Sequence, residues 1–398
     1  MLEPQGPLVT CPINNILPVE ILEMIFEEHV KVEWRAPAID GRVCRLWRQI
    51  VLNTPRAWSH LEIYSCNPPS VGELRLWLHR SGTAPLYIRV DQDFALTGDS
   101  KKWTSYNILS AYHARIASLR MLVGKLSFFE KRGFPCMRTL DVKRWSLTDS
   151  YSLPVQWGSL IELQTLRMGD TTVPLSWGVP LIMDVLWCTS LLRQSPSLTT
   201  LMLDCVSFDG VVPVAFPSLT YLSLFNVTGL KPYINAPFLA TYHEDGHISG
   251  QAESFSAPLL SLVEYGVYFL QSGTSAPTEW HLSFPNVIRV SIRAAPLVLE
   301  SFLAALSRQP QLLPALQAIS VGWRNKVFKK KDQTSMEILV RSRSKACHVG
   351  VALYFETGPP FHIPLFFGHV SHCSIRRVVV SDKDTRTQNV RCEGLLGT

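Results

Sequence analysis

The chain has 398 residues, of which 46% are hydrophobic and 18% are charged, and its formal net charge is +6. This length exceeds one ordinary compact domain, so we expect two units or one array of repeats. The modest charge gives no support to a nucleic-acid-binding surface. Asp184 and Glu264 interrupt the long apolar stretches at 179–192 and 259–270, so no window predicts a membrane span.

The N-terminal residues and the cysteines favour a protein that is not exported. The sequence does not open with a basic segment followed by an apolar one, as a secretory signal would. Nine cysteines are scattered from Cys11 to Cys392 without C-x-x-C pairs, which is typical of reduced thiols rather than of a disulfide framework. We therefore expect a cytoplasmic or nuclear protein.

Three short amphipathic helices are predicted in the first sixty residues. The first begins near Pro18, because proline suits the first helical turn, and its apolar residues keep helical spacing through Val30. The second runs from Ile39 to Ile50 with apolar residues at similar intervals. The third follows a threonine-proline pair and carries Trp58. A module this small needs a neighbour to cover its apolar residues.

Three arginines lie on one side of the second predicted helix, at Arg42, Arg45 and Arg48. Such a face could contact nucleic acid. A solvated helix face is the favoured interpretation, and we expect no nucleic-acid partner.

A set of residues between 13 and 58 forms a specific pattern. Its members are Ile13, Leu17, Pro18, Glu20, Ile21, Leu22, Ile25, Phe26, Val43, Cys44, Arg45, Trp47, Arg48, Ile50, Thr54, Pro55 and Trp58. This pattern resembles the F-box found in many fungal proteins of mushroom type. The resemblance extends to the segment W-L-x-R-S-G-x-x-P-L at 77–86.

The resemblance implies docking onto the Skp adaptor of an SCF-type cullin-RING ubiquitin ligase, and through the adaptor onto the cullin scaffold. The residues implied to bind the adaptor are Ile13, Leu17, Pro18, Ile21, Leu22, Ile25, Val43, Leu46 and Trp47. The alternative is that the same side chains form a local three-helix core against the rest of the chain.

Residues 60–90 predict a strand, a helix and a second strand. The first strand lies near 60–64, and Ser70 with Glu73 forms a capping-box signature for the helix. Gly82 is expected to end that helix, and alternating apolar residues predict a strand at 86–90. This order favours two parallel strands joined by a right-handed crossover.

Prolines open seven similar phrases along the rest of the chain. They are Pro135, Pro196, Pro217, Pro237, Pro258, Pro285 and Pro314. The positions two, five and seven residues after each proline are apolar, with Glu244 as the exception. Leu163, Leu166 and Met168 fit the same frame without the proline, and residues 119, 122 and 124 fit it weakly.

This L-x-x-L-x-L spacing resembles the kernel of leucine-rich repeats, in which the apolar positions of each short strand point into the core. We expect an α/β fold with a parallel sheet. The predicted domains are an N-terminal tail at 1–11, an F-box at 12–60, an irregular leucine-rich-repeat-like solenoid at 61–343, and a C-terminal cap or irregular closing region at 344–398. Helices are predicted in the wider gaps, at 181–194 and 297–308.

The position six residues after each proline is predicted to lie on the open face of the sheet. It is occupied by Asp141, Arg167, Met202, Ser223, His243, Glu264, Ser291 and Ser320. Because this row mixes charged, polar and apolar groups without a run of one charge, it favours a client protein as its ligand.

One segment matches a catalytic motif. His243, Glu244 and His247 satisfy the H-E-x-x-H pattern of zinc proteases, which needs both histidines on one face of a helix. The segment lies instead in a predicted repeat strand that ends at an Asp-Gly turn. We expect no catalytic residue, metal or cofactor, and a zinc hydrolase at these residues stays a remote alternative.

The sequence thus predicts a non-enzymatic substrate-receptor subunit of an SCF-type ubiquitin ligase. Its F-box would bind the Skp adaptor and its repeats would bind a client protein. The main alternative is a non-catalytic repeat scaffold whose F-box serves assembly only.

Overall fold

The computed structural model of the chain describes most of its N-terminal half and a part of its C-terminal half. The described residues are 16–63, 69–90, 100–122, 133–143, 160–169, 181–182, 191–204, 206–208, 214–225, 227, 229–245, 255, 259–268, 284–294, 304, 306, 308, 313–323, 352–357, 374–378 and 393–394.

The chain forms two compact units, one of residues 1–149 with 153–163 and the other of residues 150–152 with 164–398. The predicted boundaries after residues 60 and 343 fall inside these units and stay predictions. Over the described ranges, no helix combines the length and the apolar character that crossing a bilayer requires.

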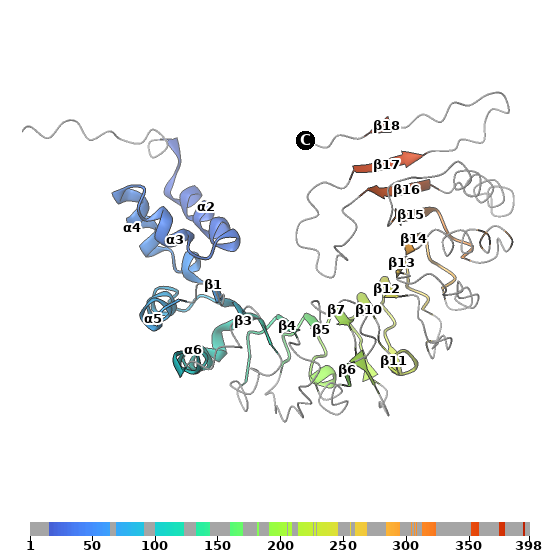
Figure 1. Cartoon of the computed structure of the whole chain (residues 1–398), viewed down its shortest axis with the longest axis horizontal. Helices are drawn as coiled ribbons and strands as arrows, with labels where there is room; N and C mark the ends of the chain where they lie inside the picture. The colour runs from blue at the N-terminus through green and yellow to red at the C-terminus, as the bar shows by residue number, and fades with distance from the viewer. Residues whose placement is uncertain are drawn as a thin grey trace, which may run out of the picture. The chain divides into compact units, whose positions relative to one another are not determined.

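The first unit begins with short helices (Figure 1). They are α2 (Val19–Val32), α3 (Ala36–Asp40), α4 (Arg45–Asn53) and the 3-10 helix η1 (Pro55–Trp58). The predicted second helix is wrong in one respect, because its residues form α3 and α4 with a turn between them. Cys44 is extended at this break, and its Sγ accepts a hydrogen bond from the backbone N–H of Trp47 at 3.5 Å. The chain therefore has to restart a helix after Cys44.

The helices share a core with the segment that follows them. In α2, Leu22, Phe26 and Val30 are buried at four-residue intervals. Trp58 is also buried, and its indole N–H donates to the backbone carbonyl of Val51 at 2.8 Å. The rings of Trp58 and Trp77 meet edge to face with centroids 4.8 Å apart, a favourable aromatic geometry.

Residues 60–90 fold as predicted into strand β1 (His60–Ile63), helix α5 (Val71–Arg80) and strand β2 (Leu86–Val90), with the two strands parallel. Ser70 and Glu73 form the complete capping box. Gly82 follows the helix with a φ of 52°, a conformation that favours glycine.

Two further parallel strands complete the described sheet of the first unit. Helix α6 (Ser100–Ala111) and the 3-10 helix η3 (His113–Arg115) lead into β3 (Ile116–Leu122), which β4 (Thr139–Lys143) follows. The weak repeat frame predicted at 119, 122 and 124 is wrong. The buried residues are Ile116, Leu119 and Met121, so the frame starts three residues earlier.

The second unit contains eight described parallel strands in chain order. They are β5 (Thr165–Gly169), β7 (Thr200–Asp204), β10 (Tyr221–Phe225), β12 (Thr241–Asp245), β13 (Glu264–Tyr268), β14 (Arg289–Ala294), β15 (Ala318–Trp323) and β16 (Ala352–Thr357). Strands β17 (Ser374–Val378) and β18 (Glu393–Gly394) continue the sheet in antiparallel fashion. Together with the first unit, this establishes a mixed α/β fold with a large parallel sheet.

Short elements lie outside this sheet. Strand β6 (Leu181–Ile182) pairs with β8 (Val206–Ser207), and β9 (Val214–Ala215) pairs with β11 (Ile234–Asn235), which follows the 3-10 helix η6 (Lys231–Tyr233). The helix predicted at 181–194 is therefore wrong at its start, although residues 191–193 are helical. In the helix predicted at 297–308, the described residues 304, 306 and 308 are helical.

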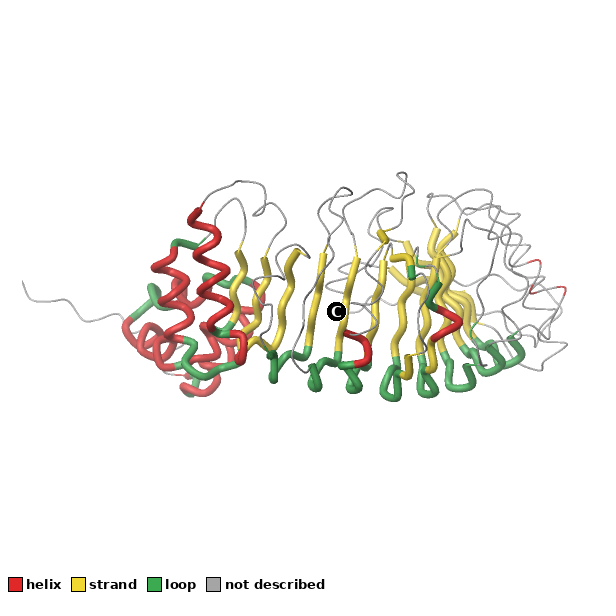
Figure 2. The backbone as a smooth tube through the Cα atoms, turned by 90° about the horizontal axis from the view of Figure 1, so that it is seen from below, coloured by secondary structure: helices red, strands yellow, loops and turns green. Residues whose placement is uncertain are grey.

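A tight turn precedes each regular strand, and these turns lie along one edge of the strands (Figure 2). The backbone N–H of Leu219 donates to the carbonyl of Phe216 at 3.3 Å, and Leu239 donates to Ala236 at 3.2 Å. From β4 onward, the first residue of each described turn before a strand of the large sheet is buried, and it stands immediately before the proline except at Leu160 and Leu259. The repeat therefore has a fourth core position that the predicted frame did not include.

The predicted core positions are confirmed in most phrases. Buried side chains at these positions are Met137, Leu140, Val142, Leu163, Leu166, Met168, Leu198, Leu201, Leu203, Leu219, Leu222, Leu224, Leu239, Tyr242, Val287, Val290, Ile292, Leu316 and Ile319. Each fully buried leucine contributes about 1.5–3 kcal/mol. The stacked strands thus share one apolar layer within each unit.

The phrase opened by Pro258 is the exception, because its frame is displaced by two residues. Leu260, predicted to be inside, is 64% exposed. The buried residues are Leu262, Tyr265 and Val267, and Tyr265 is in register with Tyr242 of the neighbouring strand. The turn here is formed by Leu259 and Leu262, whose backbone groups are hydrogen bonded at 3.2 Å.

This displacement gives a direct test of the repeat frame. Leu262→Ala should lower the free energy of unfolding by about 2–5 kcal/mol, because it leaves a cavity in the core. The matched variant Leu260→Ala should change it by less than about 0.5 kcal/mol. Urea unfolding of both proteins measures the difference, and equal effects would contradict the displaced frame.

Candidate protein-docking surfaces

The N-terminal helices expose apolar side chains beside their buried ones. Ile21 and Ile25 of α2 are 40% and 44% exposed, and Val43 between α3 and α4 is 54% exposed. Pro18 is exposed and Leu17 is half-buried at the start of α2. Because the buried residues of α2 each lie one position further along the helix, Ile21 and Ile25 form a second apolar stripe that the described core does not cover.

Not every residue predicted to bind the adaptor lies on this surface. Leu22 is 1% exposed and belongs to the core of the unit, so its predicted role in docking is wrong. Ile13 lies outside the described residues. The prediction also missed exposed apolar residues nearby, namely Ile16, Val19, Met24, Val32, Ile39 and Leu52. The resemblance carried no information about them, since they fall outside its pattern.

Leu46 and Trp47 of α4 are half-buried. The ring of Trp47 meets the ring of Phe26 edge to face, with centroids 5.1 Å apart. One part of this tryptophan is therefore fixed by the core while another part reaches the surface. Such a side chain offers a rigid apolar contact at small entropic cost.

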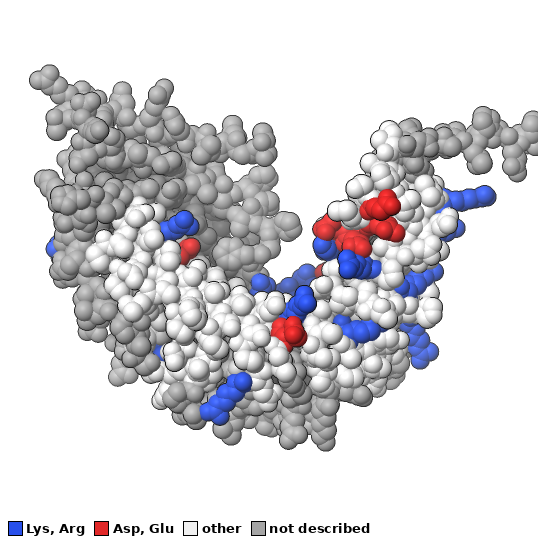
Figure 3. All heavy atoms as spheres, turned by 180° about the vertical axis from the view of Figure 1, so that it is seen from behind, with Lys and Arg blue, Asp and Glu red and all other residues white. Residues whose placement is uncertain are grey.

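Charged groups accompany the apolar ones on these helices. Acidic side chains gather on the helical part of the first unit (Figure 3), and helix α2 carries Glu20, Glu23, Glu27 and Glu28. Arg42, Arg45 and Arg48 are exposed. Arg48 donates its Nε–H to the carbonyl of Gly41 at 2.8 Å, so this arginine also fixes the turn between α3 and α4.

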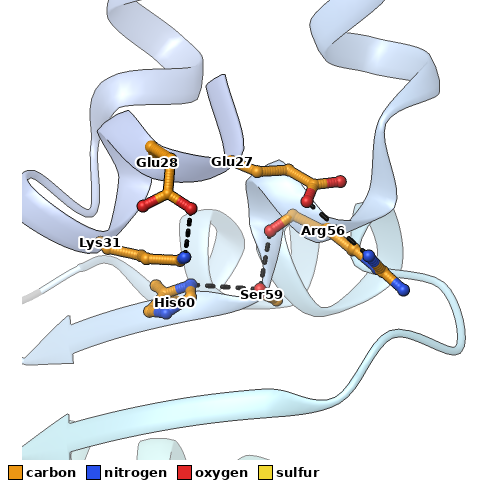
Figure 4. Close-up of polar contacts among 6 residues, drawn as sticks. All are labelled: Glu27, Glu28, Lys31, Arg56, Ser59 and His60. Carbon is orange, nitrogen blue, oxygen red and sulfur yellow. Dashed lines mark hydrogen bonds and ion pairs between the residues drawn. The ribbon is translucent and has the colours of Figure 1, made fainter. Parts of the chain in front are cut away.

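Polar contacts join the end of α2 to η1 and β1 (Figure 4). Lys31 pairs with Glu28, and Arg56 of η1 lies 3.8 Å from a carboxylate oxygen of Glu27. The hydroxyl of Ser59 donates to the carbonyl of Arg56 at 2.7 Å. Exposed pairs of this kind contribute little stability each, and of the two only the pair of Arg56 with Glu27 joins η1 to α2.

His60 is held as a neutral ring at the start of β1. Burial and, to a smaller extent, the charge of Lys31 lower its pKa to about 4, although Glu28 partly opposes them. The ring stacks on Tyr87 of β2 with centroids 4.5 Å apart and planes 8° apart. The pair forms a flat aromatic surface on the sheet of the first unit.

In the second unit, the predicted sheet-face row is in register on adjacent strands. Its aligned residues are Arg167, Met202, Ser223, His243, Gly266, Ser291 and Ser320. Glu264, predicted to belong to this row, lies two residues earlier on its strand because of the displaced frame. Arg167, Met202 and Ser291 are half-buried, whereas Ser223 and His243 are buried. The exposed part of this row is therefore smaller than predicted.

Gly266 leaves the space that the ring of His243 occupies. A Cβ atom at Gly266 would lie 2.7 Å from Cδ2 of His243, so only glycine lets the imidazole lie over this strand. The hydroxyl of Tyr221 lies 3.3 Å from Nδ1 of His243, and Oε1 of Glu264 lies 4.0 Å from its Nε2. These neighbours form a polar cluster across three strands.

Asp141, in the first unit, belongs to a row of charges that the prediction missed. Glu62, Arg89, Arg120 and Asp141 occupy matching positions on β1 to β4. Arg89 lies 3.4 Å from a carboxylate oxygen of Glu62, and Arg120 lies 3.3 Å from one of Asp141. The row could have been found by extending the frame to β1, β2 and β3.

The H-E-x-x-H segment does not form a zinc-protease helix. His243 and Glu244 are consecutive in strand β12, so their side chains point to opposite faces of the sheet. Glu244 takes the core position between Leu224 and Val267. His247 lies outside the described residues, and among the described ones no group of three or more His, Cys, Asp or Glu side chains could hold a metal ion.

Glu244 is held in the core by a network of donors. Lys231 of η6 forms an ion pair with it, the hydroxyl of Tyr242 donates to its Oε2 at 2.8 Å, and Tyr265 donates to its Oε1. Burial alone would raise the pKa of Glu244, but Lys231 and the two hydroxyls outweigh burial and lower it. Burial and the carboxylate together raise the pKa of Tyr265. Glu244 is therefore ionised, and its three donors hold the carboxylate in the core.

Removing one partner of this network should be more damaging than replacing both. Lys231→Met should lower the free energy of unfolding by about 3–5 kcal/mol because it leaves a buried charge, whereas Lys231→Met with Glu244→Leu should be less destabilised, because it leaves only the neutral hydroxyls of Tyr242 and Tyr265 without their acceptor. The lowered pKa of Glu244 gives the wild type stability that is complete above pH about 4.3 and is lost as the pH falls through the folded-state pKa. Denaturant unfolding as a function of pH measures both effects. A double variant as unstable as the single one would contradict the role of the ion pair.

Comparison of the sequence with protein-family models gives no match, and comparison with curated proteins gives none. Any function is therefore to be argued from the surfaces themselves, namely the apolar helical surface and the sheet face.

Proposed function

We propose that the chain is a substrate-receptor subunit of an SCF-type cullin-RING ubiquitin ligase. The observation that carries the proposal is the exposure of Ile21 and Ile25 on α2 and of Val43 between α3 and α4, on helices that also bury a well-packed core. An exposed apolar group on ordered helices typically marks a protein interface. The residue pattern that resembles an F-box gives the identity of the partner, the Skp adaptor.

In this proposal, Leu17 and Pro18 contact the adaptor just before α2, and Ile21 and Ile25 continue the contact along the helix. Trp47 adds a ring that the core already orients. A stable interface of ordinary size buries roughly 800 Å² on each partner. The additional apolar residues that the F-box pattern omits, such as Met24 and Ile39, supply further area for such a contact.

The chain would act by proximity rather than by bond chemistry. The helices would attach it to the ligase, and the parallel sheet would hold a client protein in the same assembly. A tethered client experiences a high effective concentration of the ubiquitin-charged enzyme. This explains how a receptor without catalytic residues promotes transfer of ubiquitin to client lysines.

Two sets of substitutions test the docking step. Ile21→Asp with Ile25→Asp should weaken binding to a purified Skp adaptor at least about tenfold, because it puts two charges into an apolar contact. Leu17→Ala with Pro18→Ala should also weaken it. The matched control is Phe238→Asp, which changes an exposed apolar residue of the second unit and should leave binding unchanged. Calorimetry measures the affinities, and retained binding by the helix variants, with folding verified by circular dichroism, would refute the proposal.

A repeat scaffold without client turnover is the second candidate. It is favoured by the burial of Ser223 and His243, which leaves less of the sheet face open for a client. The two functions differ in cells that produce either the wild type or the Ile21→Asp, Ile25→Asp variant. A receptor predicts that at least one protein accumulates with the variant and loses its ubiquitin conjugates, whereas a scaffold predicts unchanged protein levels.

A further inference from the structure

Two arginines stand side by side on the sheet of the first unit. Arg89 of β2 and Arg120 of β3 are register partners on parallel strands, which lie about 4.8 Å apart. Like charges in directly opposite positions destabilise a sheet. Local arrangements that lower the stability of the fold are often found at binding sites.

A flanking acid is paired with each of the two arginines. Glu62 and Asp141 occupy the outer positions of the row, beside Arg89 and Arg120 respectively. The contact between Glu62 and Arg89 uses the NH1 atom and is 3.4 Å long. Burial raises the pKa of Glu62, and the attraction of Arg89 lowers it by less. Each arginine thus has one acid on its outer side, and no acid stands between the two arginines in this row.

The arginines are accessible, and an aromatic surface adjoins them. The side chains of Arg89 and Arg120 are 44% and 25% exposed. Tyr87 lies two residues before Arg89 on the same face of β2, is itself exposed, and stacks on His60. Two guanidinium groups next to a tyrosine ring can bind a peptide side chain that ends in a carboxylate. Arginine binds carboxylates through paired N–H groups.

We propose that Arg89 and Arg120 bind the carboxylate of an aspartate or glutamate side chain in a protein partner. The inference deepens the proposed function, on which it rests, because that partner would be the client. A carboxylate fits better than a phosphate or a nucleic-acid backbone. Glu62 and Asp141 at the two ends of the row repel a second negative charge more strongly than a single one.

The test uses the full-length chain and defined peptide libraries. Immobilised protein is incubated with heptapeptides in which random uncharged residues surround a central Glu, Gln or phosphoserine, and separately with a single-stranded RNA decamer. The wild type should retain the Glu library at least about fivefold over the Gln library. Arg89→Gln and Arg120→Gln should reduce this preference to less than about twofold, and Arg89→Lys should keep part of it because it retains the charge but not the fork of donors.

The control is Arg75→Gln, which removes an exposed arginine of α5 and should leave the preference intact. Thermal unfolding of each variant verifies the fold. Equal retention of the Glu and Gln libraries by the wild type, an unchanged preference in the Arg89 and Arg120 variants, or stronger retention of phosphoserine or RNA would overturn the proposal. Binding of the Skp adaptor to the same variants separates this outcome from failure of the proposed function, because the adaptor-binding surface lies on the helices.

Discussion

The first unit depends on the burial of one side chain, Trp58. Its indole donates to a carbonyl of α4 and packs against Trp77 of α5. Trp58, Leu61 and Ile63 are all buried and have the L-x-x-L-x-L spacing of the repeats. The last residue of the helical module is thus the first core residue of the sheet, so the helices cannot be separated from the strands without exposing a tryptophan.

This arrangement explains why the helices keep an apolar surface. Leu22, Phe26 and Val30 are used to pack α2 onto its neighbours. A helix of this length has room for a second apolar stripe, and in α2 that stripe is open. The helices are therefore ordered by packing on one another and on Trp58, and they still expose apolar side chains. The proposed docking to an adaptor requires this combination of order and exposure.

The repeat frame could be predicted because strands have a strict two-residue period and each one needs inward apolar groups. It failed at Pro258, where the residues two and five positions later are apolar but exposed. The information that would have corrected it is the buried residue that starts each turn. Leu259 fills that place, and it puts Leu260 where the other phrases have an exposed proline.

Other features could be predicted only in part. The pattern of Leu17 to Val30 predicted α2 but did not separate exposed from buried apolar residues, since both occur at helical spacing. Leu22 and Ile21 differ by one position, and the helices that pack on α2, namely α3, α4 and η1, come from later in the chain. The break at Cys44 was missed because apolar residues continue across it at helical intervals. The network of Glu244 depends on Lys231, thirteen residues away, which no local pattern connects to it.

Glu244 also limits how the chain could change in evolution. Its strand is compatible with the core only when the preceding connection supplies Lys231 and the next strand supplies Tyr265. A duplication or exchange of the strand alone would carry a carboxylate into an apolar layer without its counter-charge. The segment from Lys231 to Tyr265 therefore forms one interdependent unit, whereas a strand with leucine at the same position needs no counter-charge from its neighbours.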